Sequence, residues 1–289
     1  MSLIHRLSSV TVLDLVGADA GAILHNLTTN EVKSLAEGVG CETFITDVRG
    51  RTLAHVYAFR TAEGFRMVGA PGQASMIAAH ADRYTIREDA VAVDRSDLFT
   101  AYVVSPAAAQ AEFSSMDWEE RGAQALDVDW LGPGTMLLLA ESADVIEREL
   151  AHLTVACGDD ASFHHNRVVA GFPWYGVDLS DRNLPQEAAR NESAISFVKG
   201  CYLGQETVAR LDALGQVQKQ LVCWRTEGTV PEPGSEVSAG EKVVGRLTSI
   251  AMESDDTALA IGMARRSHFD PGSVAQGQGF TATVIQSNS

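Results

Sequence analysis

Residues 195–210 read ISFVKGCYLGQETVAR and hold the most specific pattern in the chain. Gly200 and Gly204 allow a tight turn that is free of side chains. Residues 205–214 are mostly good helix formers, and Gly215 follows in the position of a C-terminal cap. The pattern predicts a glycine turn that leads into a helix.

Cys201 is expected on this turn, between a strand end at Ile195–Val198 and the helix. The partial positive charge of a helix N-terminus and the ammonium of Lys199 both favour a thiolate, while Glu206 opposes it where it lies close. Backbone N–H groups near Gly204 could hold a carboxylate or a phosphate. The alternative is a cysteine that packs inside as an inert thiol.

The composition is typical of a soluble globular protein, because 45% of the 289 residues are hydrophobic and 21% are charged. No stretch approaches the roughly 20 apolar residues that span a membrane, and no apolar signal core follows Met1. We therefore expect a cytoplasmic protein without membrane contact, and a monomer by default.

The cysteines and histidines predict no metal site. The cysteines stand at positions 41, 157, 201 and 223 and form no Cys-x-x-Cys pair, which argues against a zinc site or a dithiol redox motif. His164 and His165 are adjacent, and on a strand they would point to opposite faces.

The formal net charge is −16, with a pI of about 4.8. Direct tight binding of tRNA depends on Lys and Arg that neutralise phosphates, and this balance argues against it. A local basic groove remains compatible with the sequence, because net charge is not local charge. The simpler interpretation of the acidity is a surface that keeps the protein soluble.

The first three quarters of the chain mix strand and helix patterns without a regular βαβ rhythm, which favours an α+β fold. Strands are expected at residues 11–16, 42–46, 53–59, 65–68, 101–104 and 136–139. Helices are expected at residues 74–84 and 143–150. The composition changes near residue 216. Short strands and turns then alternate, as in a small β-barrel or sandwich. We therefore expect one region at 1–216 and a β-barrel domain at 217–289.

The segment Lys199–Glu206 resembles the Lys-Gly-Cys-Tyr-x-Gly-Gln-Glu signature of the YgfZ-like proteins, a folate-binding family related to the T-protein of the glycine cleavage system. The resemblance covers nearly the whole chain, except for residues 85–160. Further matching segments are 17–20, 27–32, 47–51, 167–178 and 184–187.

The resemblance implies a three-lobed ring around a central folate site. It implies tetrahydrofolate or a one-carbon derivative as cofactor, and a role in the maturation or repair of iron–sulfur enzymes, including those of tRNA modification. The partners would be such enzymes or their assembly factors. The Cys201 thiol would accept or pass a sulfur or a one-carbon unit, or act as a transient metal ligand. The alternatives are a folate-dependent aminomethyl- or methyltransferase and a non-catalytic folate-binding scaffold.

The resemblance also implies roles for single residues. Cys201 and Lys199 would be catalytic. Arg51 would lie near the glutamate tail of the folate, and Tyr175 would stack on the pterin with Phe172 and Trp174. The residues expected to bind the cofactor are Asp47, Arg51, Arg167, Tyr175, Asp178, Glu187, Tyr202, Gln205 and Glu206. The alternative for these positions is a structural role in turns, loops and packing.

Two positions depart from the family pattern. T-proteins carry an Asp for aminomethyl transfer on the strand after the first glycine turn, where this chain has Ala54-His55. Without a carboxylate to stabilise a developing cation, glycine-cleavage activity is not expected. Val169 replaces a glutamate that can bond the pterin, and such a buried charged hydrogen bond contributes roughly 1.5–3 kcal/mol.

Overall fold

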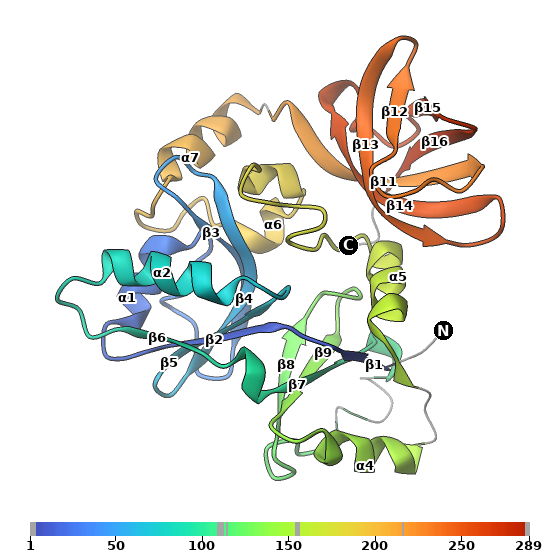
Figure 1. The fold of residues 1–289 in the computed structure, drawn as a ribbon. Helices are drawn as coiled ribbons and strands as arrows, with labels where there is room; N and C mark the ends of the chain where they lie inside the picture. Colours follow the sequence, from blue (N-terminus) through green and yellow to red (C-terminus); the bar gives the residue numbers. More distant parts are fainter. Residues whose placement is uncertain (1–3, 109–112, 114, 154–156, 216, 287–289) are drawn as a thin grey trace.

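A computed structural model describes residues 4–108, 113, 115–153, 157–215 and 217–286. The described chain forms two lobes of mixed helix and sheet and a separate β-barrel (Figure 1). The predicted α+β class with a barrel near the C-terminus is confirmed.

The first lobe is an antiparallel sheet in the order β3-β4-β5-β2-β6, with helices α1 and α2 on one face (Figure 1). Ala54, Val56 and Ala58 of β4 pack in the same apolar cluster as residues of both helices. Since successive side chains of a strand point to opposite faces, His55 and Tyr57 point away from the helices. The elements are β2 (Thr11–Val16), α1 (Ala20–Leu27), β3 (Gly40–Thr46), β4 (Thr52–Thr61), β5 (Gly64–Gly69), α2 (Ala74–Tyr84) and β6 (Val91–Asp94).

The second lobe is a sheet in the order β10-β1-β7-β9-β8, with α4 packed on it. The N-terminal strand β1 pairs antiparallel with β7 and parallel with β10, so the chain begins in the second lobe before it builds the first. The elements are β1 (Ile4–Leu7), η1 (Ser96–Leu98), β7 (Thr100–Val104), α3 (Pro106–Ala108), β8 (Ala123–Val128), β9 (Thr135–Ala140), α4 (Ala143–Leu153) and β10 (Cys157–Gly158).

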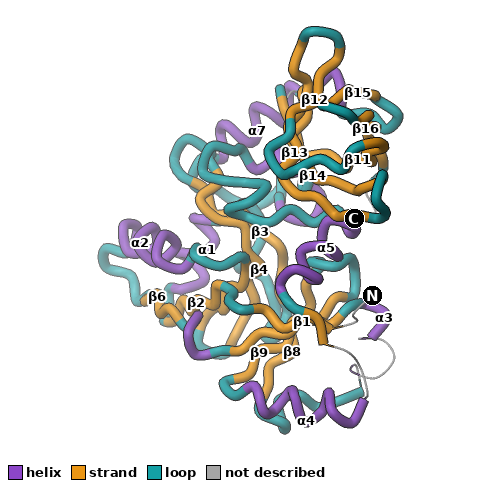
Figure 2. The backbone as a smooth tube through the Cα atoms, turned by 45° about the vertical axis from the view of Figure 1, so that its right-hand side comes forward, coloured by secondary structure: helices purple, strands orange, loops and turns teal. Residues whose placement is uncertain are grey.

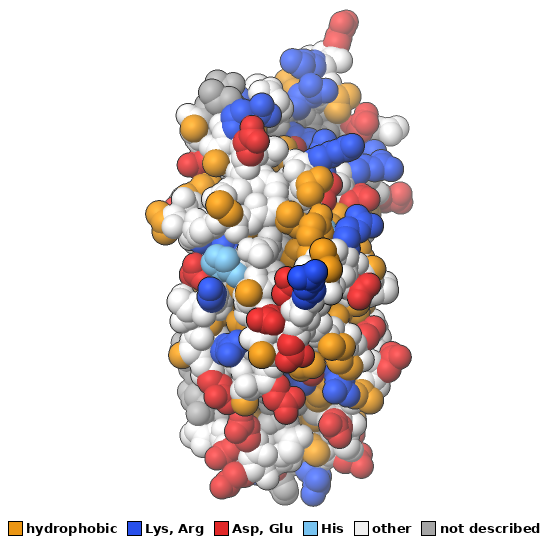
Figure 3. Space-filling view, turned by 90° about the vertical axis from the view of Figure 1, so that its left-hand side faces the viewer, with side chains coloured by type: hydrophobic (Ala, Val, Ile, Leu, Met, Phe, Trp, Pro, Cys, Tyr) orange, Lys and Arg blue, Asp and Glu red, His pale blue; other side chains and the backbone are white. Residues whose placement is uncertain are grey.

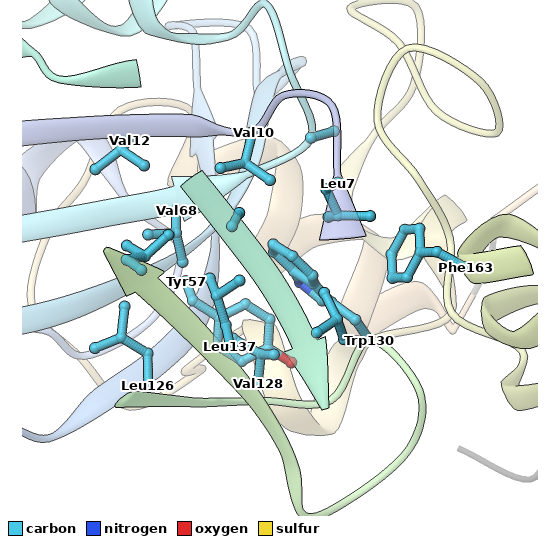
Figure 4. Close-up of a cluster of buried hydrophobic side chains, with 14 of the residues drawn as sticks. Leu7, Val10, Val12, Tyr57, Val68, Leu126, Val128, Trp130, Leu137 and Phe163 are labelled. Atoms are coloured by element: carbon cyan, nitrogen blue, oxygen red, sulfur yellow. The ribbon is translucent and has the colours of Figure 1, made fainter. Parts of the chain in front are cut away.

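A shared apolar cluster joins these two lobes (Figure 4). Tyr57 and Val68 come from the first sheet, Val128 and Leu137 come from the second, and Trp130 lies among them. Burying side chains of this size contributes about 1.5–3 kcal/mol each relative to leaving them exposed. The cluster therefore fixes the first sheet against the second.

The chain then crosses from the second lobe through α5 (Asp160–Ala170), η3 (Pro185–Ala188), α6 (Asn191–Ala194) and α7 (Gln205–Leu214). Helix α5 lies between the second lobe and the barrel (Figure 2). It begins with a capping box between Asp159 and Ser162 and ends at Gly171 in the left-handed region.

The barrel is closed, in the strand order β11-β14-β13-β12-β15-β16 around a core that includes Trp224 and Phe280. Residue 216, the predicted boundary, lies outside the described residues. We propose that the boundary falls in the connection between α7 and β11. The elements are β11 (Lys219–Gly228), β12 (Glu236–Ala239), β13 (Lys242–Met252), β14 (Thr257–Arg265), η4 (Arg266–His268), β15 (Val274–Gly277) and β16 (Phe280–Ile285).

Two local expectations are wrong. Residues 195–198 form no strand, because this segment bonds to the connection after α1, where Ser196 N donates to Thr29 O at 3.0 Å. His164 and His165 lie on helix α5 and not on a strand, because the capping box starts a helix before them. The helix at 205–214 and the left-handed Gly215 cap, with φ 59°, are as predicted.

Candidate functional site

Cys201 is exposed and free, and it precedes helix α7 on the glycine turn. The alternative that this thiol packs inside the protein is therefore excluded. Helix α7 begins after Gly204, which adopts φ 77° in the left-handed region. Of the other three cysteines, Cys157 is also exposed, while Cys41 and Cys223 are partly buried.

The turn that carries Cys201 packs against the hairpin turn between β3 and β4. A Cβ on Gly204 would come within 2.5 Å of both the Asp47 carbonyl oxygen and the Gly50 Cα, so only glycine fits this contact. Next to it, Thr46 Oγ1 donates to the Leu203 carbonyl at 2.7 Å. The two glycine turns thus form one unit although the sequence separates them widely.

Lys199 is buried and uses all three protons of its ammonium group. Its Nζ donates to the carbonyls of His25, Thr28 and Asn30 at 2.8, 2.7 and 2.7 Å. These carbonyls lie at and after the C-terminal end of α1, where a cation is favourable. Burial lowers the pKa of Lys199 to about 8. The geometry gives Lys199 the role of a structural tie that holds the Cys201 turn on α1.

His25 borders the same turn, and no sequence pattern predicted a role for it. A Cβ on Gly200 would lie 3.6 Å from His25 Nε2, and His25 Nδ1 lies 3.2 Å from Glu31 Oε1. Burial, with the charge of Lys199, lowers the pKa of His25, so the imidazole is biased toward its neutral form. No local pattern indicates this residue, because only the fold brings α1 next to residue 200.

A second polar cluster lies on the face of the β3–β4 pair that points away from α1 and α2. The sequence did not predict this cluster either. The Glu42 carboxylate accepts from Arg190 Nη2 at 2.5 Å and from Arg190 Nε at 3.0 and 3.2 Å. It also lies 2.7 Å from His55 Nε2, and it accepts from the Tyr57 hydroxyl at 3.3 Å. Burial alone would raise the pKa of Glu42, but the bonds from His55 and Arg190 lower it to about 2. Glu42 is therefore a carboxylate with all its partners inside the protein.

The His55 ring is stacked between two aromatic rings. The centroid distances are 4.6 Å to Phe44 and 5.5 Å to Phe172, with interplanar angles of 21° and 16°. The cavity beside it is also lined by Trp130 and Tyr175, and its volume of about 10 Å³ is near the minimum for one water. This stack fills the face of β4 that points away from α1 and α2, which is the inner face of the strand.

Arg167 and Asp178 form a buried ion pair of 2.7 Å that ties α5 to the barrel. Arg167 Nη2 donates to Ser249 Oγ at 2.7 Å, while Asp178 Oδ1 accepts from Thr248 and Ser249 at 2.5 and 2.6 Å. Adjacent strand residues normally point apart, but a bulge between Leu247 and Ser249 lets both hydroxyls reach one carboxylate. These two predicted cofactor residues are bonded to each other and to β13.

The remaining predicted residues fall into three places. Glu187 accepts from Asn183 Nδ2 at 2.8 Å and lies 3.3 Å from Lys219 Nζ of the barrel. The Tyr175 hydroxyl donates to the Thr52 carbonyl at 3.4 Å. The other residues belong to the two glycine turns or to the first turn of α7: Asp47, Arg51, Tyr202, Gln205 and Glu206.

Within those turns the contacts are mainly to the backbone. Asp47 Oδ1 accepts from the backbone N–H groups of Arg49 and Arg51 at 2.9 and 2.8 Å, and Arg51 Nη1 donates to the Arg182 carbonyl at 2.5 Å. Tyr202 is buried with its ring 5.0 Å from Lys199 Nζ. Cys201, Lys199, Asp47 and Arg51 are thus brought into one region, while Arg167 and Asp178 lie at the barrel junction.

Charge is unevenly spread on the face that carries α1, α2 and α7. Figure 3 shows this face, with Lys and Arg side chains gathered in its upper third and Asp and Glu more frequent in its lower half. Among the described residues, no group of three or more His, Cys, Asp or Glu is arranged to hold a metal ion. None of the helices in the described ranges is long and apolar enough to cross a membrane.

Comparison with solved structures places this architecture among known proteins. The glycine cleavage system aminomethyltransferase T of Bartonella henselae matches with a TM-score of 0.84, covering 99% of this chain and 86% of that one, at 15% identity. At this identity, the match defines the fold alone. No protein-family model matches the chain.

Curated relatives narrow the assignment. The tRNA-modifying protein YgfZ of Cronobacter sakazakii is 26% identical over 238 residues, covering 77% of this chain and 71% of that protein. The mitochondrial iron–sulfur cluster assembly factor IBA57 of Mus musculus is 28% identical over 267 residues, covering 85% and 72%. The chain is a YgfZ-like relative of the aminomethyltransferases.

A further relative of this YgfZ-like chain is a chloroplastic protein of Arabidopsis thaliana whose name assigns it to the transferases. It is 28% identical over 253 residues, and the match spans 81% of the chain but only 58% of the longer plant protein. The relatives thus carry names from iron–sulfur assembly, tRNA modification and group transfer.

Proposed function

We propose that this YgfZ-like chain is an accessory protein for the maturation or repair of iron–sulfur enzymes, including those that modify tRNA, and that the Cys201 thiol is its reacting group. Its relatives named YgfZ and IBA57 support the process. The observation that carries the residue assignment is the exposed thiol on a turn that is fixed on both sides.

The physical argument is preorganisation. A nucleophile or a metal ligand works best when its backbone is already fixed and its sulfur is accessible. Lys199 fixes the turn before Cys201, and the contact of Gly204 with Gly50 fixes it afterwards. Once it has lost its proton, the thiolate can coordinate an iron ion, or it can attack a sulfur or carbon atom of a partner from which another group leaves with the electron pair of the broken bond.

Two residues in the predicted site receive different roles in this proposal. Lys199 donates all its protons to carbonyls and positions the turn, so we assign it no contact with the substrate. Arg51 and Asp47 build the neighbouring turn. The cytoplasmic location and the monomeric state remain predictions.

The pterin of the predicted tetrahydrofolate does not fit into the space beside His55. A bicyclic pterin is many times larger than the cavity of about 10 Å³ beside His55. Arg167, Asp178 and Glu187 are bonded within the protein. We therefore assign the folate no step in the proposed function.

The second candidate is a transferase, favoured by the shared fold and by the name of the plant relative. Ala54 lies in the apolar core and His55 is stacked between aromatic rings, so neither supplies the carboxylate that aminomethyl transfer uses. An assay of one-carbon transfer from an amine donor to tetrahydrofolate is expected to give no product above the uncatalysed rate.

The test of the main proposal is genetic rescue. A bacterial strain that lacks its own YgfZ is transformed with the wild-type chain or with Cys201→Ser, and the activity of an iron–sulfur tRNA-modifying enzyme is measured. We expect rescue by the wild type and its loss in the variant. Failure of the wild-type chain to rescue, at normal expression, contradicts the proposed process.

A further inference from the structure

We propose that the chain closes its own central site: the His55 ring occupies the aromatic slot on the inner face of β4, and the protein acts through Cys201 without bound folate. This inference rests on the proposed function for the role of Cys201. It depends on His55, Glu42 and Arg190, none of which belongs to the predicted site.

The direction of His55 follows from the alternation of β4. Ala54 has no exposed surface and packs with α1 and α2, so the neighbouring His55 points to the opposite face of the sheet. The sequence departs from the T-protein pattern at this Ala-His pair. Since Ala54 faces the helices, His55 is the side chain presented where that family carries a carboxylate.

The His55 ring makes the two kinds of contact that would hold a planar heteroaromatic ligand in this slot. Its faces are covered by Phe44 at 4.6 Å and Phe172 at 5.5 Å, both nearly parallel to it. Its edge nitrogen Nε2 lies 2.7 Å from the Glu42 carboxylate. Stacking and a carboxylate at the ring edge are what would hold a pterin, and here an internal side chain uses both.

The groups around this stack are also satisfied internally. Arg190 binds the Glu42 carboxylate through two nitrogens, and its guanidinium carbon lies 5.1 Å from the Phe172 centroid. The Tyr57 hydroxyl accepts from Asp129 N at 3.0 Å while it donates to Glu42. Displacing His55 would leave a buried carboxylate short of a partner, which costs about 1–3 kcal/mol or more for a charged group.

The second departure from the family pattern fits the same account. Val169 stands where a glutamate can bond a pterin, and it packs against the apolar cluster that contains Phe44 and Leu179. The cavity left beside His55 has a volume of about 10 Å³. Val169 offers a pterin no carboxylate and His55 fills the slot, so both departures act against folate binding.

The experiment is calorimetric titration of the full-length wild-type chain with tetrahydrofolate under reducing, anaerobic conditions. We expect no saturable binding tighter than about 1 mM. A wild-type dissociation constant in the micromolar range would overturn the inference.

A second measurement tests the slot itself. His55→Gly removes the ring, and free imidazole at millimolar concentration is added to the variant and to the wild type. We expect imidazole to raise the melting temperature of the variant by several degrees and to leave the wild type unchanged. Equal shifts, or no shift in the folded variant, contradict the claim that His55 fills a preformed aromatic slot.

These outcomes separate the inference from the proposed function. Folate binding together with loss of rescue in Cys201→Ser removes the inference and leaves the proposed function intact. Failure of the wild-type chain to rescue removes the proposed function, whatever the calorimetry gives.

Discussion

Gly204 and Gly50 lie backbone against backbone, so closely that a Cβ on Gly204 would come within 2.5 Å of the Gly50 nitrogen and Cα. One glycine belongs to the turn that carries Cys201, and the other belongs to the hairpin turn that Asp47 closes. The contact explains why two separate glycine motifs occur in one chain. It holds the exposed thiol on the first sheet.

Gly204→Ala is expected to destabilise the protein by about 3 kcal/mol, because it adds a backbone clash to left-handed strain of about 1–2 kcal/mol. Denaturant unfolding measures this change. Gly72→Ala is the matched control, since Gly72 has φ 83° but a Cβ added there would meet nothing within 4 Å. Equal losses in the two variants would mean that the contact with Gly50 contributes nothing.

Lys199→Met is expected to lower the free energy of unfolding by about 3 kcal/mol at neutral pH, because three carbonyls lose their donor. The thiol of Cys201 should then react more slowly with iodoacetamide, because its turn is less fixed and the ammonium that favours a thiolate is gone. Lys33→Met, at an exposed lysine near the same segment, is the control. Unchanged stability in Lys199→Met would show that the tie is not needed.

The same lysine gives a pH dependence. Its pKa is about 8 in the folded state against an ordinary 10.5, so the unfolded chain binds more protons between these values. The wild type should therefore gain stability relative to Lys199→Met as the pH rises from 8 to 10.5. A constant difference in unfolding free energy across this range would contradict the lowered pKa.

Glu42→Gln is expected to cost about 3–5 kcal/mol at pH 7, because Arg190 loses its buried charged partner. The folded pKa of Glu42 is about 2 against an ordinary 4.5, so its stabilisation is complete above pH 4.5 and is lost as the pH falls toward 2. The difference between the wild type and the variant should shrink over that window. Glu206→Gln, at an exposed carboxylate, should show neither effect.

Asp178→Asn is expected to cost about 3–5 kcal/mol and to loosen the barrel from α5, because Arg167 stays buried without its counter-charge. Thermal unfolding and limited proteolysis between α5 and β13 measure the two effects. Asp181→Asn, three residues along on the exposed part of the same loop, is the control. Matching stabilities for the two variants would remove the role of the ion pair.

Local patterns predicted most of the fold. Helix α7 and its Gly215 cap, the strands β3, β4 and β5 and the barrel follow from propensity, alternation and turn residues, which act over a few positions. The motif also indicated that Cys201 lies on a turn before a helix. The error at residues 195–198 arose because hydrogen bonds to the connection after α1 replace a strand partner.

The site was only partly predictable. His25, Glu42 and Arg190 carry no local signal, because each acquires its role from a residue far along the chain. Arg167 and Asp178 matched a motif, yet the structure pairs them with each other and with a bulge in β13 that no short pattern predicts. Burial and pairing therefore decide which residues of a motif remain available to a ligand.

The most direct test of the account compares Cys201→Ser with Cys157→Ser, which removes the other exposed thiol. Both variants are introduced into a strain that lacks its own YgfZ, and the activity of an iron–sulfur tRNA-modifying enzyme is measured beside the wild-type chain. We predict that Cys157→Ser restores activity like the wild type and that Cys201→Ser, equally stable and equally expressed, does not. Full rescue by Cys201→Ser would contradict the account.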